Sequence, residues 1–156
     1  STPANNEKVL LVGGGVGVAP LFMAGKYLRE QAYEIEFVLG YRSSEHIVDL
    51  DEFRSLAEVH ITTEDASRGE KGFVVDHTRF QRVDYSRIYC CGPDPMMRAV
   101  AGLAKQKDVF CEVSLENLMA CGIGVCLCCI EETVNGNLCA CTEGPVFNVK
   151  DLKWQI

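Results

Sequence analysis

The sequence predicts an α/β fold, a five-stranded doubly wound parallel sheet followed by a small cysteine-rich module. Up to residue 113, short apolar runs alternate with stretches of helical periodicity, which is typical of consecutive βαβ units. Glycines follow the first apolar run, where a nucleotide-binding sheet carries its phosphate loop. Six cysteines then fall between residues 121 and 141. We therefore expect a nucleotide-binding domain over residues 1–113 and a cluster-binding module over residues 114–156.

The strands are predicted from short apolar runs, and the helices from apolar residues that recur every three or four positions. Residues 9–12 are apolar throughout, as expected for a central strand that is buried on both faces. The segment 64–72 is polar and contains glycine, so we expect a loop there. The other predicted strands span 35–40, 59–63, 88–91 and 109–113, and the predicted helices span 18–31, 49–57, part of 73–80, and 95–105.

After Ser114 the segments are short and rich in glycine and cysteine, so we expect a small appended module. Strand-like pieces cover residues 129–133 and 137–142, and Asn135-Gly136 between them is a favourable hairpin turn. On a strand over 137–142, Cys139 and Cys141 would point to the same face. Spacing alone therefore leaves these two cysteines as competing ligands.

The composition excludes several classes of protein. The formal net charge is −7 and there is no cluster of Lys or Arg, which disfavours nucleic acid as a partner. No apolar run approaches the roughly 18–20 residues that span a bilayer, and the polar N-terminus is unlike a signal peptide. We therefore expect a cytoplasmic protein without membrane contact. Because the chain lacks an initiator methionine and runs almost directly into a strand, we also expect it to be part of a longer protein.

The cysteines indicate a metal site, because thiols stay reduced in the cytoplasm and a tight cluster there binds metal more often than it forms disulfides. Cys121, Cys126 and Cys129 follow the C-x4-C-x2-C spacing of plant-type [2Fe–2S] proteins. Gly122 and Gly124 would let backbone N–H groups approach the sulfurs and help to set the reduction potential. The alternatives are zinc, which favours two separated C-x2-C pairs, a [4Fe–4S] cluster, and purely structural thiols.

Two further segments indicate a dinucleotide at the carboxyl edge of the sheet. Residues 13–20 read Gly-Gly-Gly-Val-Gly-Val-Ala-Pro between the first strand and the first helix, where backbone N–H groups and a helix N-terminus can bind a pyrophosphate. Residues 91–96 read Cys-Gly-Pro-Asp-Pro-Met after the fourth strand, next to that loop across the switch point of the sheet. We expect the pyrophosphate at the first segment and a nicotinamide at the second, although tight packing alone would also explain the glycines.

Together these segments resemble the NAD(P)-binding domain of the ferredoxin–NADP reductase superfamily. Residues 114–126, which read Ser-Leu-Glu-Asn-Leu-Met-Ala-Cys-Gly-Ile-Gly-Val-Cys, and residues 141–147, which read Cys-Thr-Glu-Gly-Pro-Val-Phe, are similar to a narrower family. This family is the electron-transfer, iron–sulfur subunit of NAD-linked, two-subunit bacterial dihydroorotate dehydrogenase. The stretch 63–76 resembles the same subunit, so the similarity covers essentially the whole chain.

The resemblance implies an N-terminal FAD-binding β-barrel, absent from this chain, ahead of the NAD domain and the [2Fe–2S] module. It implies a hetero-oligomer in which electrons from the FMN of a catalytic partner subunit pass singly through the cluster to FAD, which gives hydride to NAD⁺ in pyrimidine (UMP) biosynthesis. By the same resemblance, the cluster ligands are Cys121, Cys126, Cys129 and Cys141; Gly14, Gly15, Gly17 and Pro20 lie by the dinucleotide phosphates; and Cys91, Gly92 and Pro93 lie by the nicotinamide.

Some residues lie outside this pattern. Cys128 and Cys139 are additional to it. No residue resembles a general acid or base, which hydride transfer does not require, so no catalytic side chain is predicted. Glu64 and Asp65 would repel a 2′-phosphate if they face the ribose, which favours NAD over NADP. The alternative functions are a subunit of an NAD(P)H-dependent ferredoxin oxidoreductase and a zinc-stabilised binding module without enzymatic activity.

Overall fold

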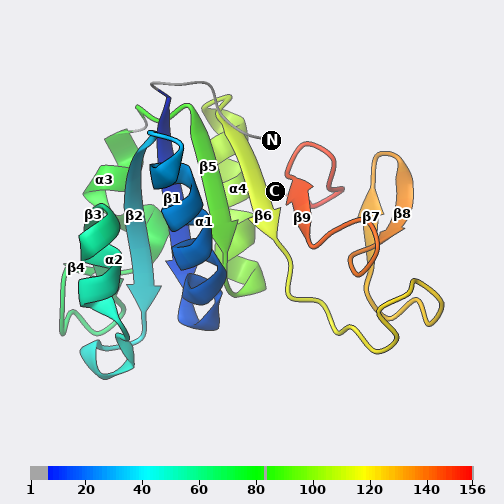
Figure 1. Cartoon of the computed structure of the whole chain (residues 1–156), viewed down its shortest axis with the longest axis horizontal. Coiled ribbons are helices and arrows are strands. Elements are labelled where there is room, and N and C mark those ends of the chain that lie inside the picture. The colour runs from blue at the N-terminus through cyan, green and yellow to red at the C-terminus, as the bar shows by residue number, and fades with distance from the viewer. Residues whose placement is uncertain (1–6, 83, 156) are drawn as a thin grey trace.

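The computed structural model describes residues 7–82 and 84–155, and its centre is a mostly parallel sheet with helices on both faces (Figure 1). Over these residues the sheet has seven strands in the order β4-β3-β2-β1-β5-β6-β9, and none of the helices is long and apolar enough to cross a membrane. The strands are β1 (Lys8–Gly14), β2 (Glu34–Tyr41), β3 (Glu58–Thr63), β4 (Glu70–Lys71), β5 (Arg87–Cys91), β6 (Phe110–Ser114) and β9 (Val146–Asn148). The helices are α1 (Val18–Glu30), α2 (Leu50–Leu56), α3 (Thr78–Arg82) and α4 (Asp94–Gln106), with short 3₁₀ turns η1 (Gly15–Gly17), η2 (Ser44–His46) and η3 (Val74–Asp76).

The two faces of the sheet carry separate hydrophobic cores, because side chains alternate along each strand. In β1, Val9 and Leu11 pack with α1 and α2, whereas Leu10 and Val12 pack with α4. All four side chains are fully buried, and β1 has a parallel neighbour on each side. The prediction of a central strand at residues 9–12 is therefore confirmed.

The five predicted strands form the parallel core β3-β2-β1-β5-β6. The described sheet has two more strands than the five that the sequence predicted. Glu70 and Lys71, which lie in the predicted loop, add the short strand β4 beside Thr62 and Thr63. The strand β9 pairs antiparallel with β6 at the other edge. Neither strand was predicted, because two or three residues carry no periodicity that a sequence pattern can report.

The cysteine-rich module is continuous with the sheet. Besides the pairing of β9 with β6, Leu152 and Trp154 pack into the same hydrophobic core as α4. The Arg98 guanidinium on α4 stacks 4.6 Å from the centre of the Trp154 ring. Figure 1 shows the module beside the β6 edge of the sheet. The domain boundary between residues 113 and 114 stays a prediction.

A separate two-stranded hairpin carries part of the cysteine cluster. It consists of β7 (Ile130–Thr133) and β8 (Gly136–Cys139), which pair antiparallel. Its loop is Val134 and Asn135, so the turn lies one residue earlier than predicted. Gly136 follows with a φ of 101°, the positive value that a glycine supplies after such a turn.

The strand predicted over residues 137–142 was too long. β8 ends at Cys139, because the N–H groups of Thr142 and Glu143 both bond to the Cys139 carbonyl and turn the chain back. Cys139 and Cys141 therefore do not share one face of a strand, and the argument that made them equivalent from spacing was wrong.

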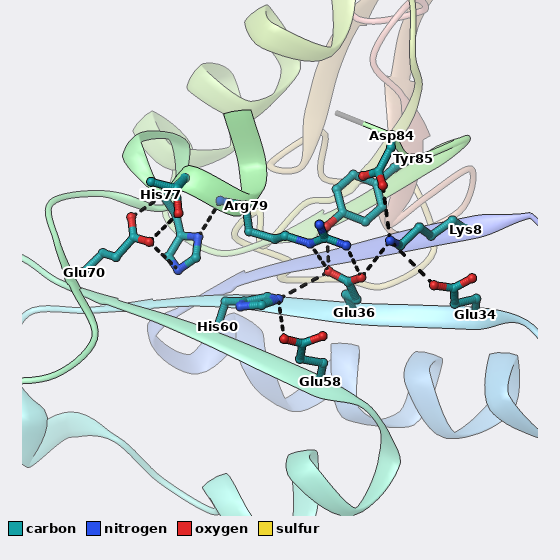
Figure 2. Close-up of polar contacts among 11 residues, drawn as sticks. Lys8, Glu34, Glu36, Glu58, His60, Glu70, His77, Arg79, Asp84 and Tyr85 are labelled. Atoms are coloured by element: carbon teal, nitrogen blue, oxygen red, sulfur yellow. Dashed lines mark hydrogen bonds and ion pairs between the residues drawn. The ribbon is translucent and has the colours of Figure 1, made fainter. Parts of the chain in front are cut away.

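A buried carboxylate, Glu36 on β2, ties the sheet to α3 (Figure 2). The Arg79 guanidinium donates to both of its oxygens, at 2.6 and 2.5 Å. The Lys8 ammonium lies 2.9 Å from Oε1, and the Tyr85 hydroxyl donates to Oε2 at 2.7 Å. Burial alone would raise the pKa of Glu36, but these donors outweigh it and hold the pKa well below its usual value. Glu36 is therefore a charged anchor between three elements of the fold.

The same carboxylate belongs to a group of possible metal ligands. Glu36, Glu58 and His60 each bring one ligand atom within 4.8 Å of the others. His60 Nε2 lies 3.3 Å from Glu36 Oε2 and 3.7 Å from Glu58 Oε1. Both oxygens of Glu36 already accept hydrogen bonds from Arg79, and the Arg79 and Lys8 cations oppose a further positive charge. We assign this group a structural role.

Candidate functional site

The glycine segment passes directly over the end of β5, as expected at a switch point of the sheet. β1 and β5 are parallel neighbours, and Gly13 pairs with Cys91. A Cβ atom on Gly17 would lie 2.5 Å from the carbonyl carbon and oxygen of Cys91, and a Cβ atom on Gly14 would lie 2.6 Å from the Met96 sulfur. Backbone contact therefore requires glycine at position 17, whereas a side chain at position 14 would only displace the flexible Met96 side chain.

The rest of the segment faces outward and leads into α1. Gly15, Val16 and Pro20 are exposed, and no atom lies within 4 Å of the Cβ position of Gly15. No side chain caps the N-terminus of α1, which begins at Val18. The end of a 13-residue helix carries partial positive charge. This edge can therefore bind a pyrophosphate through backbone N–H groups.

The turn Cys91-Gly92-Pro93 supplies the neighbouring part of this edge. The Cys91 side chain is buried, whereas Pro93 is exposed and precedes α4 as its N-cap. Burial raises the pKa of Cys91, and the Glu116 carboxylate raises it further. The Cys91 thiol lies 3.9 Å from Glu116 Oε1. It therefore stays protonated and donates toward that carboxylate, so it is no nucleophile.

Glu116 is a residue of this edge that the sequence did not single out. It lies just after β6, on the segment that leads from the sheet to the cysteine loop, and its side chain is exposed beside the Cys91 thiol. Its position in the sequence could have identified it, because it follows a predicted parallel strand and therefore lies at the edge where β1 and β5 also end. A carboxylate here contributes charge next to the place predicted for the nicotinamide.

The first two predicted cluster ligands lie together on an irregular loop. Gly122 and Gly124 have φ values of 69° and 75°, and Leu127 has a φ of 60°, so the loop turns sharply between the cysteines. The Cys126 N–H group donates to Cys121 Sγ at 3.4 Å. Backbone N–H donation, first from Cys126, lowers the pKa of Cys121 to about 6. The loop therefore stabilises a thiolate at this position.

The other two predicted ligands form a second pair. Cys129 precedes β7, and its carbonyl accepts a hydrogen bond from Ala140 at 2.9 Å across the hairpin. The Cys141 N–H group donates to Cys129 Sγ at 3.4 Å and lowers the pKa of that thiol. The structure thus places Cys121 beside Cys126, and Cys129 beside Cys141.

This arrangement fits a [2Fe–2S] cluster, which takes four thiolates, two on each iron. Backbone N–H groups already donate to one sulfur of each pair, as they do around iron–sulfur clusters. A single zinc ion would gather four sulfurs about 3.8 Å apart around one centre. Over residues 7–82 and 84–155, no three cysteine sulfurs lie within 4.8 Å of one another. The donor set therefore suits a two-metal cluster better than one zinc ion.

The remaining cysteines lie in different surroundings. Cys90 and Cys111 are buried in β5 and β6. Cys128 is exposed, and its thiol points toward the carbonyl of the nearby predicted ligand Cys126 at 3.9 Å. Cys139 is half-buried at the end of β8. Of these four, only Cys128 and Cys139 lie in the cluster region.

Two known domain families match the chain. Residues 11–102 match the oxidoreductase NAD-binding domain. Residues 116–153 match the iron–sulfur cluster binding domain of dihydroorotate dehydrogenase B. The two matches cover the nucleotide edge and the cysteine loop respectively.

Relatives with curated names are similar over nearly the whole chain. The electron transfer subunit of dihydroorotate dehydrogenase B (NAD(+)) from Shouchella clausii is 40% identical over 94% of this chain and 57% of its own length. A probable subunit of the same name from Archaeoglobus fulgidus is 40% identical, with 96% and 63% covered. A solved chain of NADH-dependent reduced ferredoxin–NADP oxidoreductase is 32% identical with a TM-score of 0.84, covering 97% of this chain and 57% of that chain. The chain thus spans little more than half the length of these proteins.

Proposed function

The chain belongs to the oxidoreductase NAD-binding domain family and carries an iron–sulfur cluster binding domain of the dihydroorotate dehydrogenase B type, and on that premise we propose that it acts in the electron-transfer subunit of an NAD-linked dihydroorotate dehydrogenase. The observation that carries the proposal is the pairing of the cysteine thiols on a module whose core is continuous with the nucleotide-binding sheet. The 40% identity to subunits of that name supports it.

The residues at the carboxyl edge would bind and orient the dinucleotide. Gly17 keeps the loop close to the end of β5, Gly14 packs beside Met96 and Pro93, and Gly15 and Pro20 would face the phosphates. The turn at Cys91, Gly92 and Pro93 would hold the nicotinamide, with Glu116 beside it. Hydride transfer needs position rather than a proton donor, so the absence of a predicted general acid agrees with this role.

The cluster ligands in this proposal are Cys121, Cys126, Cys129 and Cys141. When bound, a [2Fe–2S] cluster carries one electron at a time, whereas hydride carries two, so a flavin must operate next to it. We place FAD in the further length that the relatives have and this chain does not span, and FMN in a catalytic partner subunit. The proposal keeps the cytoplasmic location expected from the sequence, where these thiols stay reduced.

The surface around the cysteine loop suits a protein partner. Leu118, Ile123 and Val125 are 86%, 71% and 72% exposed, and Met119 and Leu127 are also exposed. Apolar side chains gathered in this way usually mark an interaction surface. A catalytic subunit docked here would lie against the cluster.

A subunit of an NAD(P)H-dependent ferredoxin oxidoreductase is the second candidate. The observation that favours it is the solved relative at 32% identity and a TM-score of 0.84. The two functions differ in the protein that exchanges electrons with the cluster. Both would use the same dinucleotide site at the carboxyl edge of the sheet. The partner protein therefore decides between them.

The test starts from anaerobically purified protein. We expect about two irons and two acid-labile sulfides per chain, and an EPR signal after dithionite reduction. A colourless protein with stoichiometric zinc would contradict the proposal. Next, dihydroorotate and the catalytic subunit are added under argon and the visible absorbance is followed. Bleaching by this pair supports dihydroorotate dehydrogenase, and bleaching by reduced ferredoxin alone supports the second candidate.

The exposed carboxylate of Asp65 gives a prediction about cofactor choice. Asp65 Oδ1 accepts hydrogen bonds from the N–H and hydroxyl groups of Ser67, at 2.9 and 2.6 Å, and the Ser67 hydroxyl accepts one from Ser44 N–H. These contacts fix the carboxylate near the ends of β2 and β3. If it faces the ribose, Asp65→Asn should strengthen NADPH binding about tenfold and leave NADH binding nearly unchanged. Calorimetric titration with both nucleotides checks this.

The matched control is Glu30→Gln, which removes the same charge at the exposed end of α1, on the opposite edge of the sheet. It should not alter the NADPH to NADH ratio. An equal change in both variants would mean that only overall charge matters and that Asp65 does not face the ribose.

A further inference from the structure

Asn117 lies where the segment that leaves the sheet meets the cysteine-bearing hairpin, and the proposed function gives it no role. Its side-chain amide donates to Glu131 Oε1 at 2.7 Å and points toward the Cys129 carbonyl, 3.5 Å away. An ionised carboxylate only accepts hydrogen bonds, so the nitrogen of the Asn117 amide must be the atom that faces Glu131. Both side chains are half-buried. One hydrogen bond therefore joins the segment after β6 to strand β7, next to a predicted ligand.

The loop that follows Asn117 has few other attachments. Residues 115–120 form neither helix nor strand and lead from β6 to the cysteine loop (Figure 1). No backbone-to-backbone hydrogen bond joins residues 118–128 to the rest of the described chain. The side chains of Leu118 and Met119 are exposed, so they do not anchor this stretch in a core. The Asn117 side chain is therefore the hydrogen-bonded attachment that lies just ahead of the loop.

The position of this attachment matters because the predicted thiol pairs lie on different parts of the module, one on the loop and one on the hairpin. A [2Fe–2S] cluster needs both pairs at one fixed separation, since all four thiolates bind the same small object. The hairpin side is already fixed, because Cys129 is buried and its carbonyl accepts the Ala140 N–H group at 2.9 Å. The hydrogen bond between Asn117 and Glu131 fixes the start of the loop relative to it.

We propose that Asn117 is a positioning residue, which holds the loop pair of thiols at the correct distance from the hairpin pair through its hydrogen bond to Glu131. The inference rests on the proposed function only in that the chain holds a [2Fe–2S] cluster. Asn117 acts through the placement of the sulfurs and does not itself bind iron. Without this hydrogen bond the loop should open more often, so that a bound cluster is lost faster and its ligand geometry becomes less uniform.

The test compares the parental protein with three variants after anaerobic purification. Asn117→Asp keeps the size of the side chain but replaces the donor by a carboxylate that repels Glu131. The double variant Asn117→Asp with Glu131→Gln reverses the pair, so that an amide on β7 donates to a carboxylate on the segment after β6. The control, Asn135→Asp, adds the same charge at the exposed turn of the hairpin, where aspartate before glycine is also favourable.

Three quantities are measured for each protein. Iron and labile sulfide are determined before and during incubation with a chelator, and EPR spectra are recorded after dithionite reduction. Hydrogen exchange of the apo-protein over residues 116–128 reports the opening of the loop without any cluster bound. Circular dichroism of each apo-protein verifies folding, and reconstitution with iron and sulfide gives a second route to the loaded state.

We expect Asn117→Asp to lose iron about tenfold faster than the parental protein, because a hydrogen bond to a charged group is lost. Its EPR signal should broaden, and hydrogen exchange over residues 116–128 should be faster. The reversed pair should recover most of the parental rate, and Asn135→Asp should match the parental protein. The inference is overturned if Asn117→Asp behaves like the parental protein, if the reversed pair is no better than Asn117→Asp, or if Asn135→Asp is equally impaired. A parental protein that takes up no iron would instead refute the proposed function.

Discussion

Replacing Gly17 by alanine is expected to abolish detectable NADH binding and to lower the free energy of unfolding by about 2–3 kcal/mol. The added Cβ atom would lie 2.5 Å from the Cys91 carbonyl and 2.6 Å from the Gly92 nitrogen. These are backbone atoms, so no rotamer change can relieve the overlap, and the loop must lift off the end of β5. That movement displaces the phosphate and nicotinamide parts of the edge together. Fluorescence titration with NADH and urea denaturation measure both effects.

The control for this prediction is Gly15→Ala in the same loop. No atom lies within 4 Å of the new Cβ position, and the cost comes only from the φ of 56°, about 1 kcal/mol. Gly15→Ala should therefore be clearly more stable than Gly17→Ala. Equal stability of the two variants would show that contact with residues 91 and 92 does not hold the loop in place.

Replacing Glu36 by glutamine is expected to lower the free energy of unfolding by about 3 kcal/mol. The glutamine side chain would still fit the space, but Arg79 and Lys8 would lose the charge that both contact. A nearly buried cation without its partner costs far more than the loss of a surface ion pair. Helix α3 should loosen first, since Arg79 provides one of its contacts with the sheet. Urea denaturation measures the loss, and hydrogen exchange over residues 78–82 locates it.

Glu34→Gln provides a matched control on the same strand. Glu34 is 68% exposed, and its contact with Lys8 is 3.5 Å long. This variant should change the free energy of unfolding by less than about 0.5 kcal/mol. A loss as large as that of Glu36→Gln would mean that overall charge, not the buried anchor, sets the stability.

The pH dependence of Glu36→Gln follows from the sign of the pKa shift. The pKa of Glu36 is lower in the folded chain than its ordinary value of 4.5. The carboxylate therefore stabilises the fold above pH 4.5, and this contribution is lost as the pH falls below that value. The difference in stability between the parental protein and Glu36→Gln should shrink in acid.

The parallel core of the sheet could be predicted because its strands are short, apolar and punctuated by loops. Residues 9–12 and 88–91 are of this kind, and both became central strands. The glycine segments after β1 and β5 also predicted that these two strands end next to each other, because a doubly wound sheet places its binding loops at the carboxyl ends of neighbouring strands. These features depend on local sequence, which a single chain displays.

The rest depends on contacts between distant residues. Glu36 occupies a strand position that reads as an exposed alternating site, and its burial follows from Arg79 and Tyr85, more than forty positions away. The end of β8 at Cys139 is set by hydrogen bonds from the following turn. Glu116 meets Cys91 only because β5 and β6 are neighbours. None of these contacts produces a local hydrophobic pattern from which it could be predicted.

The cysteine spacing predicted that a cluster site exists, but spacing could not show how the sulfurs are grouped. That grouping comes from the loop, where positive φ values at Gly122 and Gly124 aim the backbone toward Cys121, and from the hairpin that brings Cys141 to Cys129. The ligand set itself stays a prediction until iron is measured.

The antiparallel pairing of β9 with β6 bears on how the protein can be shortened. A fragment that ends at residue 113, the predicted domain boundary, would leave the amide and carbonyl groups on the outer side of β6 without partners. It would also uncover Val113, which Phe147 normally shields. An exposed edge strand of this kind can form hydrogen bonds with strands of other molecules. Such a fragment should aggregate, so the cysteine-rich module also keeps the neighbouring sheet soluble.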